Sequence, residues 1–196
     1  MKISLAAAAV AATLSCGAVS AATIDFEDVP FGTYSGVTTG GVTFTLEGGT
    51  GTFDVVDASP GGPISGHALI SYFQNDENTF PFKATMAGGF SSFSIGMGDY
   101  GADDDEGHLM AYDAGGGLLD SDTLFVPDGS YDGGILSVSS ATPIAYVLFY
   151  ETGTYPGAVY WDSVEFTAAA VPEPETYALM LLGLAGVAAV ARRRRT

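Results

Sequence analysis

The chain has 196 residues, which is enough for one domain of ordinary size together with terminal targeting segments. All but two of its 23 acidic residues lie between residues 22 and 171, where Lys83 is the only basic residue. So acidic a body excludes nucleic acid as a partner, because it repels phosphate. Cys16 is the only cysteine. We expect it to leave with an N-terminal leader, so the body has no disulfide.

The N-terminus is typical of a cleavable signal peptide over residues 1–22. Lys2 precedes an apolar run over residues 3–14, and small residues at 19–22 form a cleavage site. The apolar run is too short to cross a bilayer. The sequence therefore predicts export, with removal of this segment by signal peptidase.

The body, residues 23–167, alternates apolar and polar positions in short runs separated by Gly, Asp, Pro and Ser. Runs of this kind are 24–28, 42–47, 53–56, 68–73, 80–86, 92–97, 109–112, 123–126, 135–138 and 163–166. Residues 144–150 are apolar on both faces and predict a central strand. This pattern predicts an all-β, two-sheet antiparallel sandwich of jelly-roll type, with a barrel as the alternative.

The C-terminal tail has three parts. A linker over residues 168–176 holds two prolines that stop the preceding strand. An apolar stretch over residues 177–191 predicts a single short transmembrane helix, and the basic end, residues 192–196, predicts a cytoplasmic terminus. The motif in the linker consists of Val171, Pro172, Glu173 and Pro174.

This tail resembles the PEP-CTERM sorting signal in its motif, its glycine-bearing apolar helix and its basic end. The resemblance implies an inner-membrane intermediate that an exosortase cleaves near residues 172–174. It also implies delivery to the cell surface or the extracellular matrix of bacteria that make exopolysaccharide and biofilm. A plain single-pass anchor is the alternative.

The densest acidic segment, residues 99–107, predicts a Ca²⁺ site, because hard oxygen ligands on a glycine-rich loop suit this ion. Asp103 and Asp105 are the first choice of ligands, since alternate residues of an extended loop can point the same way. Asp25 and Asp162, on the terminal strands, are the second choice. The alternative for the acidic segment is a solvated turn.

No catalytic motif stands out, so we expect a non-enzymatic surface or matrix protein. Trp161 falls on the outward register with Ser163 and Glu165, where its ring could stack on a sugar. A jelly-roll carbohydrate-binding module that contacts extracellular polysaccharide is therefore the alternative. A glycoside hydrolase that uses paired carboxylates is the second alternative.

Overall fold

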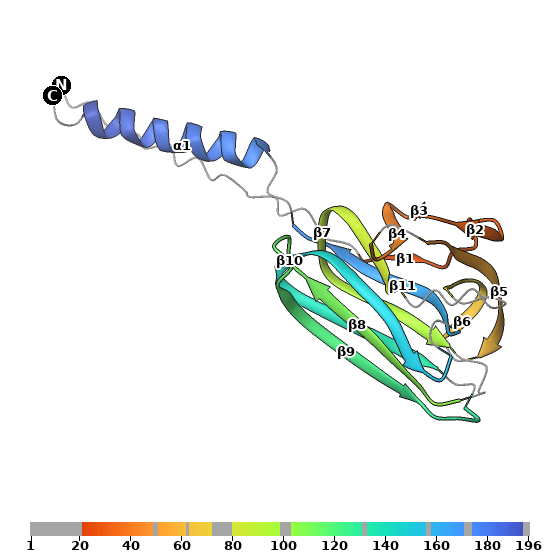
Figure 1. Ribbon diagram of the computed structural model, residues 1–196. Coiled ribbons are helices and arrows are strands. Elements are labelled where there is room, and N and C mark those ends of the chain that lie inside the picture. The colour runs from red at the N-terminus through yellow and green to blue at the C-terminus, as the bar shows by residue number, and fades with distance from the viewer. Residues whose placement is uncertain are drawn as a thin grey trace, which may run out of the picture.

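The computed structural model describes residues 21–48, 51–61, 63–71, 80–98, 103–130, 133–155, 158–170 and 174–193. Eleven strands and one helix lie within these ranges (Figure 1). Their bounds are β1 Ala21–Ile24, β2 Gly32–Tyr34, β3 Val37–Thr39, β4 Val42–Leu46, β5 Phe53–Gly61, β6 Ile64–Ile70, β7 Phe82–Gly98, β8 Asp105–Tyr112, β9 Leu118–Val126, β10 Gly134–Gly153, β11 Tyr160–Ala168 and α1 Pro174–Arg193. The prediction of an all-β antiparallel body followed by a short helix is confirmed for these residues.

β7 and β10 are longer than the sequence predicted, because each joins two runs expected as separate strands. β7 contains residues 82–86 and 92–97, and β10 contains residues 135–138 and 144–150. The two strands pair with each other along both of their halves. They therefore form the central pair of the sheet.

A bend divides each of these long strands. In β7, Gly88 and Gly89 have φ angles of 84° and 78°, a left-handed conformation that favours glycine. A Cβ on Gly89 would stand 2.5 Å from the carbonyl oxygen of Ile144 on β10. Opposite this point the β7–β10 register shifts between Ser139 and Ile144. The glycines thus permit both the turn of the chain and the close approach of the two strands.

The bend gives the two halves of β7 different neighbours. The first half pairs with β4, which pairs with β3, whereas the second half pairs with β11. Beyond β11 lie β6, β5 and β2, and β1 pairs with the last residues of β11. β10 pairs in turn with β8, and β8 with β9. The strands form one continuous sheet that folds over on itself (Figure 1).

Aromatic rings from both parts of the sheet meet in one core. Phe53 of β5 packs edge-on against Phe82 of β7, with ring centroids 5.2 Å apart. Phe149 of β10 stacks on Phe82 at 5.1 Å. Each fully buried aromatic side chain stabilises the fold by about 1.5–3 kcal/mol. This shared cluster holds the folded-over sheet together without a disulfide.

Of the run over residues 24–28, only Ile24 lies in a strand, so the strand predicted there is wrong. β1 ends at Ile24, and Phe26 adopts a φ of 56°. The backbone N–H of Val29 donates to the carbonyl oxygen of Phe26 at 2.9 Å, which turns the chain. Phe26 is nevertheless fully buried against Phe44, as its apolar position in the run requires.

The predicted C-terminal helix exists as α1 but begins three residues before the expected apolar stretch and ends two residues after it. Among the described residues, no helix has the length and apolar character needed to cross a membrane. The prediction of a transmembrane helix is therefore corrected. The apolar stretch over residues 177–191 rises only about 22 Å at 1.5 Å per residue, against about 30 Å of bilayer hydrocarbon.

Candidate functional site

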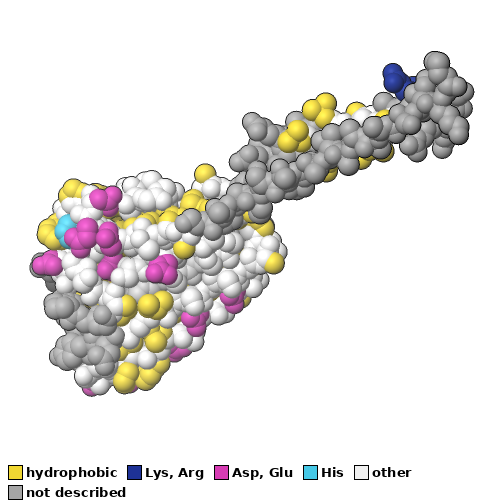
Figure 2. Space-filling model, turned by 180° about the vertical axis from the view of Figure 1, so that it is seen from behind, with side chains coloured by type: hydrophobic (Ala, Val, Ile, Leu, Met, Phe, Trp, Pro, Cys, Tyr) yellow, Lys and Arg dark blue, Asp and Glu magenta, His cyan; other side chains and the backbone are white. Residues whose placement is uncertain are grey.

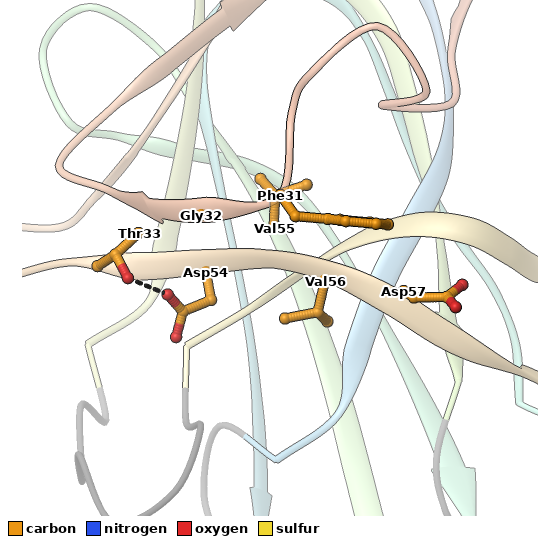
Figure 3. A pocket seen from close by; sticks show the side chains of 7 residues that line it. All are labelled: Phe31, Gly32, Thr33, Asp54, Val55, Val56 and Asp57. Carbon is orange, nitrogen blue, oxygen red and sulfur yellow. Dashed lines mark hydrogen bonds between the residues drawn. The ribbon is translucent and has the colours of Figure 1, made fainter.

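A pocket of about 380 Å³ lies at the edge of the body, over β2 and β5 (Figure 3). The two strands pair there in antiparallel register, with Gly32 opposite Val55 and Thr33 opposite Asp54. The pocket is lined by Phe31, Gly32, Thr33, Asp54, Val55, Val56 and Asp57. It combines one exposed aromatic ring with two carboxylates.

Phe31 is held in place by the turn that leads into β2. Its side chain is 57% exposed, and its ring lies 4.1 Å from the imidazole ring of His67. The Nδ1–H of His67 donates to the carbonyl oxygen of Val29 at 2.8 Å, which fixes the imidazole. The hydroxyl of Tyr34 donates to the carbonyl oxygen of Pro30 at 2.7 Å, which fixes the turn. One face of the Phe31 ring is thus supported while much of the side chain remains in solvent.

The two carboxylates of the pocket, Asp54 and Asp57, differ in their hydrogen bonding and in their exposure to solvent. Asp54 accepts a hydrogen bond from the hydroxyl of Thr33 at 2.5 Å, whereas Asp57 is exposed. Figure 3 shows both side chains on the strand that faces Phe31. An aromatic face packs against apolar C–H groups, and carboxylates accept hydrogen bonds from hydroxyls. This arrangement suits a ligand with an apolar face and a hydroxylated rim.

Acidic side chains also gather around a histidine at the end of the body that lies away from the helix (Figure 2). Glu27 contributes here, because its Oε1 accepts the backbone N–H of His67 at 3.0 Å and its Oε2 lies 3.8 Å from the Nε2 of His67. The pocket is therefore bordered by negatively charged side chains, with Glu27 beside His67 and Asp54 and Asp57 in its lining.

The structure corrects the prediction for Trp161. Its side chain is only 1% exposed, and its ring packs edge-on against Phe149 at 5.1 Å. The cause is an extra residue in β11: the register with β7 shifts between Asp162 and Glu165, and Ser163 has a φ of 53°. Such a bulge inverts the alternation on one side of it. Trp161 is therefore a core residue and provides no exposed stacking surface.

Phe31 is the exposed ring that the sequence analysis missed. It stands in a turn between prolines and glycines, outside any alternating run, and a lone exposed aromatic carries no periodic signal. Pro30 before it and Gly32 after it are residue types typical of a turn, but they carry no information about its neighbour in space. Only the pairing of β2 with β5 and the packing on His67 bring the pocket together.

Asp103 and Asp105 both lie beside the end of β10. Asp103 accepts the backbone N–H of Thr154 at 3.0 Å, and Asp105 is 2% exposed where it starts β8. Glu151, which the sequence analysis did not single out, is also buried. Residues 99–102 of the acidic segment lie outside the described residues.

Three oxygens converge beside Gly153. A Cβ on this glycine would stand 2.7 Å from Oδ1 of Asp105, 3.0 Å from Oε1 of Glu151 and 2.9 Å from the carbonyl oxygen of Asp104. Asp105, the carbonyl of Asp104 and Glu151 therefore form a close group of oxygens, whereas the side chains of Asp104 and Glu106 are exposed. Asp105 and Glu151 are buried, and neither of them lines the Phe31 pocket.

Asp162 is a buried carboxylate near the start of β11. Its Oδ2 accepts the backbone N–H of Ser65 at 3.2 Å and the hydroxyl of Ser163 at 3.4 Å. Its Oδ1 has no hydrogen-bond partner among the described residues. Burial, with a smaller contribution from the negative charge of Asp25, raises the pKa of Asp162 to about 6, although the hydrogen bonds from Ser163 and Ser65 act to lower it. Asp25 and Asp162 are thus close enough to interact, although Asp25 itself is exposed.

No group of three or more His, Cys, Asp or Glu side chains within the described ranges is arranged to hold a metal ion. From the described residues, each candidate calcium site therefore offers at most two carboxylates, and backbone or water oxygens would have to complete the shell. Of the predicted sorting motif, Val171, Pro172 and Glu173 lie outside the described residues, and Pro174 is the first residue of α1.

Comparison with known proteins finds the PEP-CTERM protein-sorting motif at residues 170–195. This match covers the C-terminal tail and none of the strands. No curated protein matches the chain significantly.

Several solved structures are similar to the body at low sequence identity. A DUF4465 family protein from Bacteroides caccae has a TM-score of 0.50 at 11% identity, over 76% of this chain and 100% of that chain. At this identity the likeness shows the fold alone. The K3 cleaved adhesin domain of Lys-gingipain from Porphyromonas gingivalis has a TM-score of 0.45 at 15% identity, over 75% and 98% of the two chains. The CBM22-1 xylan-binding domain of Xyn10C from Paenibacillus barcinonensis has a TM-score of 0.44 at 14% identity, over 78% and 98%.

Proposed function

We propose that this chain, which carries a PEP-CTERM protein-sorting motif at residues 170–195, is an exported protein that an exosortase processes and delivers to the cell surface or the extracellular matrix. The single observation that carries this proposal is the motif, because it combines the proline–glutamate segment, the helix and the arginines in order at one end of the chain. The inner-membrane stage of such a route stays a prediction.

The boundaries of the body support processing at this place. β11 ends at Ala168, and the backbone N–H of Ala169 donates to the carbonyl oxygen of Gly89 at 2.9 Å, which ties the chain to the sheet. α1 begins only at Pro174. A cut near residues 172–174 would remove the helix and the arginines and would leave every strand and the whole core in place. The released body would remain folded.

For the body we infer a jelly-roll-like sandwich of two sheets. The pairing supports this topology, because β7 and β10 pass through both halves of the sheet and rings from both halves meet in the core. The inferred role is non-enzymatic. The hydrolase alternative would need paired carboxylates at a cleft, and Asp54 and Asp57 are the pair to test, because both line the pocket.

A second candidate function is recognition of a polysaccharide at the Phe31 pocket. The observation that favours it is the exposed ring of Phe31, which is supported from behind by His67 and flanked by Asp54 and Asp57. A pyranose ring presents an apolar C–H face and a rim of hydroxyls, and this is the chemistry that the pocket can contact. A surface protein in an exopolysaccharide matrix would meet such a ligand at high local concentration.

The test of the main proposal is mass spectrometry of the mature protein from its native host. We expect an N-terminus at Ala22 or Thr23 and the absence of residues 177–196. Extracellular protein that still carries Arg192 and the following arginines would overturn exosortase processing. In the same preparation, hydrolysis of host polysaccharide that disappears in Asp54→Asn would overturn the non-enzymatic role.

A further inference from the structure

Two carboxylates fill a gap between β6 and β11. The two strands pair only at Leu69 and Trp161, and beyond this point β11 pairs with β1 instead. In the gap, backbone N–H groups of β6 point at side chains rather than at a strand. Ser65 donates to Asp162 and His67 donates to Glu27. Acidic side chains therefore stand where a neighbouring strand would have supplied carbonyl oxygens.

Asp162 is the deeper of these carboxylates and is incompletely satisfied. Its side chain is 1% exposed, and only Oδ2 accepts hydrogen bonds from described residues. An ionised carboxylate that is removed from water is costly unless both oxygens are paired. The bulge at Ser163 causes this placement, because it turns both Trp161 and Asp162 away from solvent.

Within the described ranges, this carboxylate takes part in no ion pair. Lys83 is the only basic residue between residues 22 and 171, and its Nζ lies 3.5 Å from Glu47 and over the ring of Tyr146. A second carboxylate, Asp25, lies on the neighbouring segment instead: Ile24 pairs with Val164 in antiparallel register, so the chain after Ile24 continues alongside Ser163 and Asp162. The repulsion between two carboxylates near one another, one of them buried with an open oxygen, is relieved when one takes up a proton or when a cation joins them.

We propose that Asp162, through its open Oδ1, and Asp25 together bind a Ca²⁺ ion that links β11 to the segment after β1. Ca²⁺ fits because the donors are hard oxygens and because this ion accepts irregular shells of six to eight oxygens. Water and backbone carbonyls complete the shell, since no third His, Cys, Asp or Glu among the described residues joins the group. So few charged ligands place the affinity in the weak range of extracellular calcium modules, a Kd of about 10⁻⁴–10⁻³ M.

The experiment uses the full-length chain, freed of divalent ions with a chelator and then titrated with CaCl₂ in a calorimeter. Thermal melts in CaCl₂ and in NaCl of equal ionic strength accompany the titration, because screening acts in both salts and coordination in only one. The variants are Asp162→Asn, Asp25→Asn and the control Glu165→Gln. Glu165 is an exposed carboxylate on the same strand, so its variant loses the same charge without touching the site.

We expect Asp162→Asn and Asp25→Asn each to weaken calcium binding by at least about tenfold, as loss of a ligand or its support does. The melting increment that is specific to CaCl₂ should shrink in both variants and persist in Glu165→Gln. Asp25→Asn keeps the test valid if Asp162→Asn does not fold, because Asp25 is exposed. A wild-type chain that melts identically in the two salts would overturn the proposal.

Binding that survives in Asp162→Asn and Asp25→Asn would also overturn it. In that case the double variant Asp103→Asn/Asp105→Asn identifies the acidic segment as the site if it abolishes binding. The two sites can be separated in this way because they lie at different strands, with Asp105 at the start of β8 and Asp162 on β11.

Discussion

The carboxylate of Asp122 on β9 accepts the backbone N–H of Ser137 on β10 at a distance of 2.9 Å. Two residues earlier on β9, Asp120 accepts the N–H of Ser139 at the same distance. The first half of β10 has no backbone register with β9, so these side chains provide hydrogen bonds that a strand partner would otherwise give. Carboxylates thus close the edge between the two parts of the folded-over sheet.

We predict that Asp120→Ala/Asp122→Ala lowers the free energy of unfolding by about 1–3 kcal/mol, because each lost hydrogen bond contributes about 0.5–1.5 kcal/mol. Urea denaturation measures this change. Asp128→Ala is a control, since Asp128 is exposed and, among the described residues, only its backbone N–H takes part in a hydrogen bond. A double variant that is as stable as this control would show that the two carboxylates do not hold the edge.

The buried carboxyl of Asp162 gives stability a specific pH dependence in chelator. Its folded pKa of about 6 lies above the ordinary value of 3.8, so the folded state binds the proton more tightly. Its contribution to stability is therefore greatest below about pH 4, falls as the pH rises through 6 and then stays constant. Each pKa unit corresponds to about 1.4 kcal/mol, so the charged form costs about 3 kcal/mol at pH 7.

We accordingly predict that Asp162→Asn is more stable than the wild type at pH 7 by up to about 3 kcal/mol, and that this gain disappears near pH 4. The amide keeps an oxygen for the N–H of Ser65. Urea denaturation of both proteins at several pH values measures the difference in their free energies of unfolding. The other carboxylates are present in both proteins, so their contributions cancel in this difference. A difference that is constant with pH would mean that Asp162 is not protonated in this range.

The bulge in β11 depends on the left-handed conformation of Ser163. A β-branched side chain is strained at positive φ, so we predict that Ser163→Val lowers the free energy of unfolding by about 1–2 kcal/mol or more. Ser163→Gly should lose less, because glycine accepts this φ and sacrifices only the hydrogen bonds from the hydroxyl to the carbonyl oxygen of Pro63 and to the carboxylate of Asp162. Equal losses in the two variants would show that the hydroxyl and not the backbone conformation matters there.

Loss of the Phe31 ring should weaken binding to polysaccharide. We predict that Phe31→Ala lowers the affinity for the host exopolysaccharide by about 0.5–1.5 kcal/mol or more, in line with the value of one aromatic contact. Phe125→Ala is the matched control, because Phe125 is 60% exposed on β9, away from the pocket residues. Affinity gel electrophoresis with that polysaccharide measures the change. Equal retardation of the two variants would exclude the pocket as the site.

The sorting motif should act independently of the body. Replacement of Pro172, Glu173 and Pro174 by alanine should leave an intact tail on a folded protein, because these residues follow the last strand. Mass spectrometry of the C-terminus and circular dichroism of the purified protein measure the two effects. Normal removal of residues 177–196 in this variant would show that the motif is only a linker.

Local patterns were enough to predict the tail and most of the strands, but not β2 and β3, which lie outside the predicted runs. Alternation of apolar and polar residues identifies a strand because successive side chains point to opposite faces, and this holds wherever the chain is regular, as in β4 and β8. The prolines, the apolar run and the arginines of the tail are likewise read from the sequence without any contact to the body. The sorting motif is therefore recognised from the sequence alone, and the proposed export route rests on it.

The tertiary structure decided everything that depends on an irregularity or on distant pairing. One extra residue at Ser163 reversed the predicted side of Trp161 and buried Asp162, because a single insertion exchanges the two faces of a strand. Phe31 and His67 meet only because the turn before β2 packs on β6. Such contacts join residues tens of positions apart, and no local pattern encodes them.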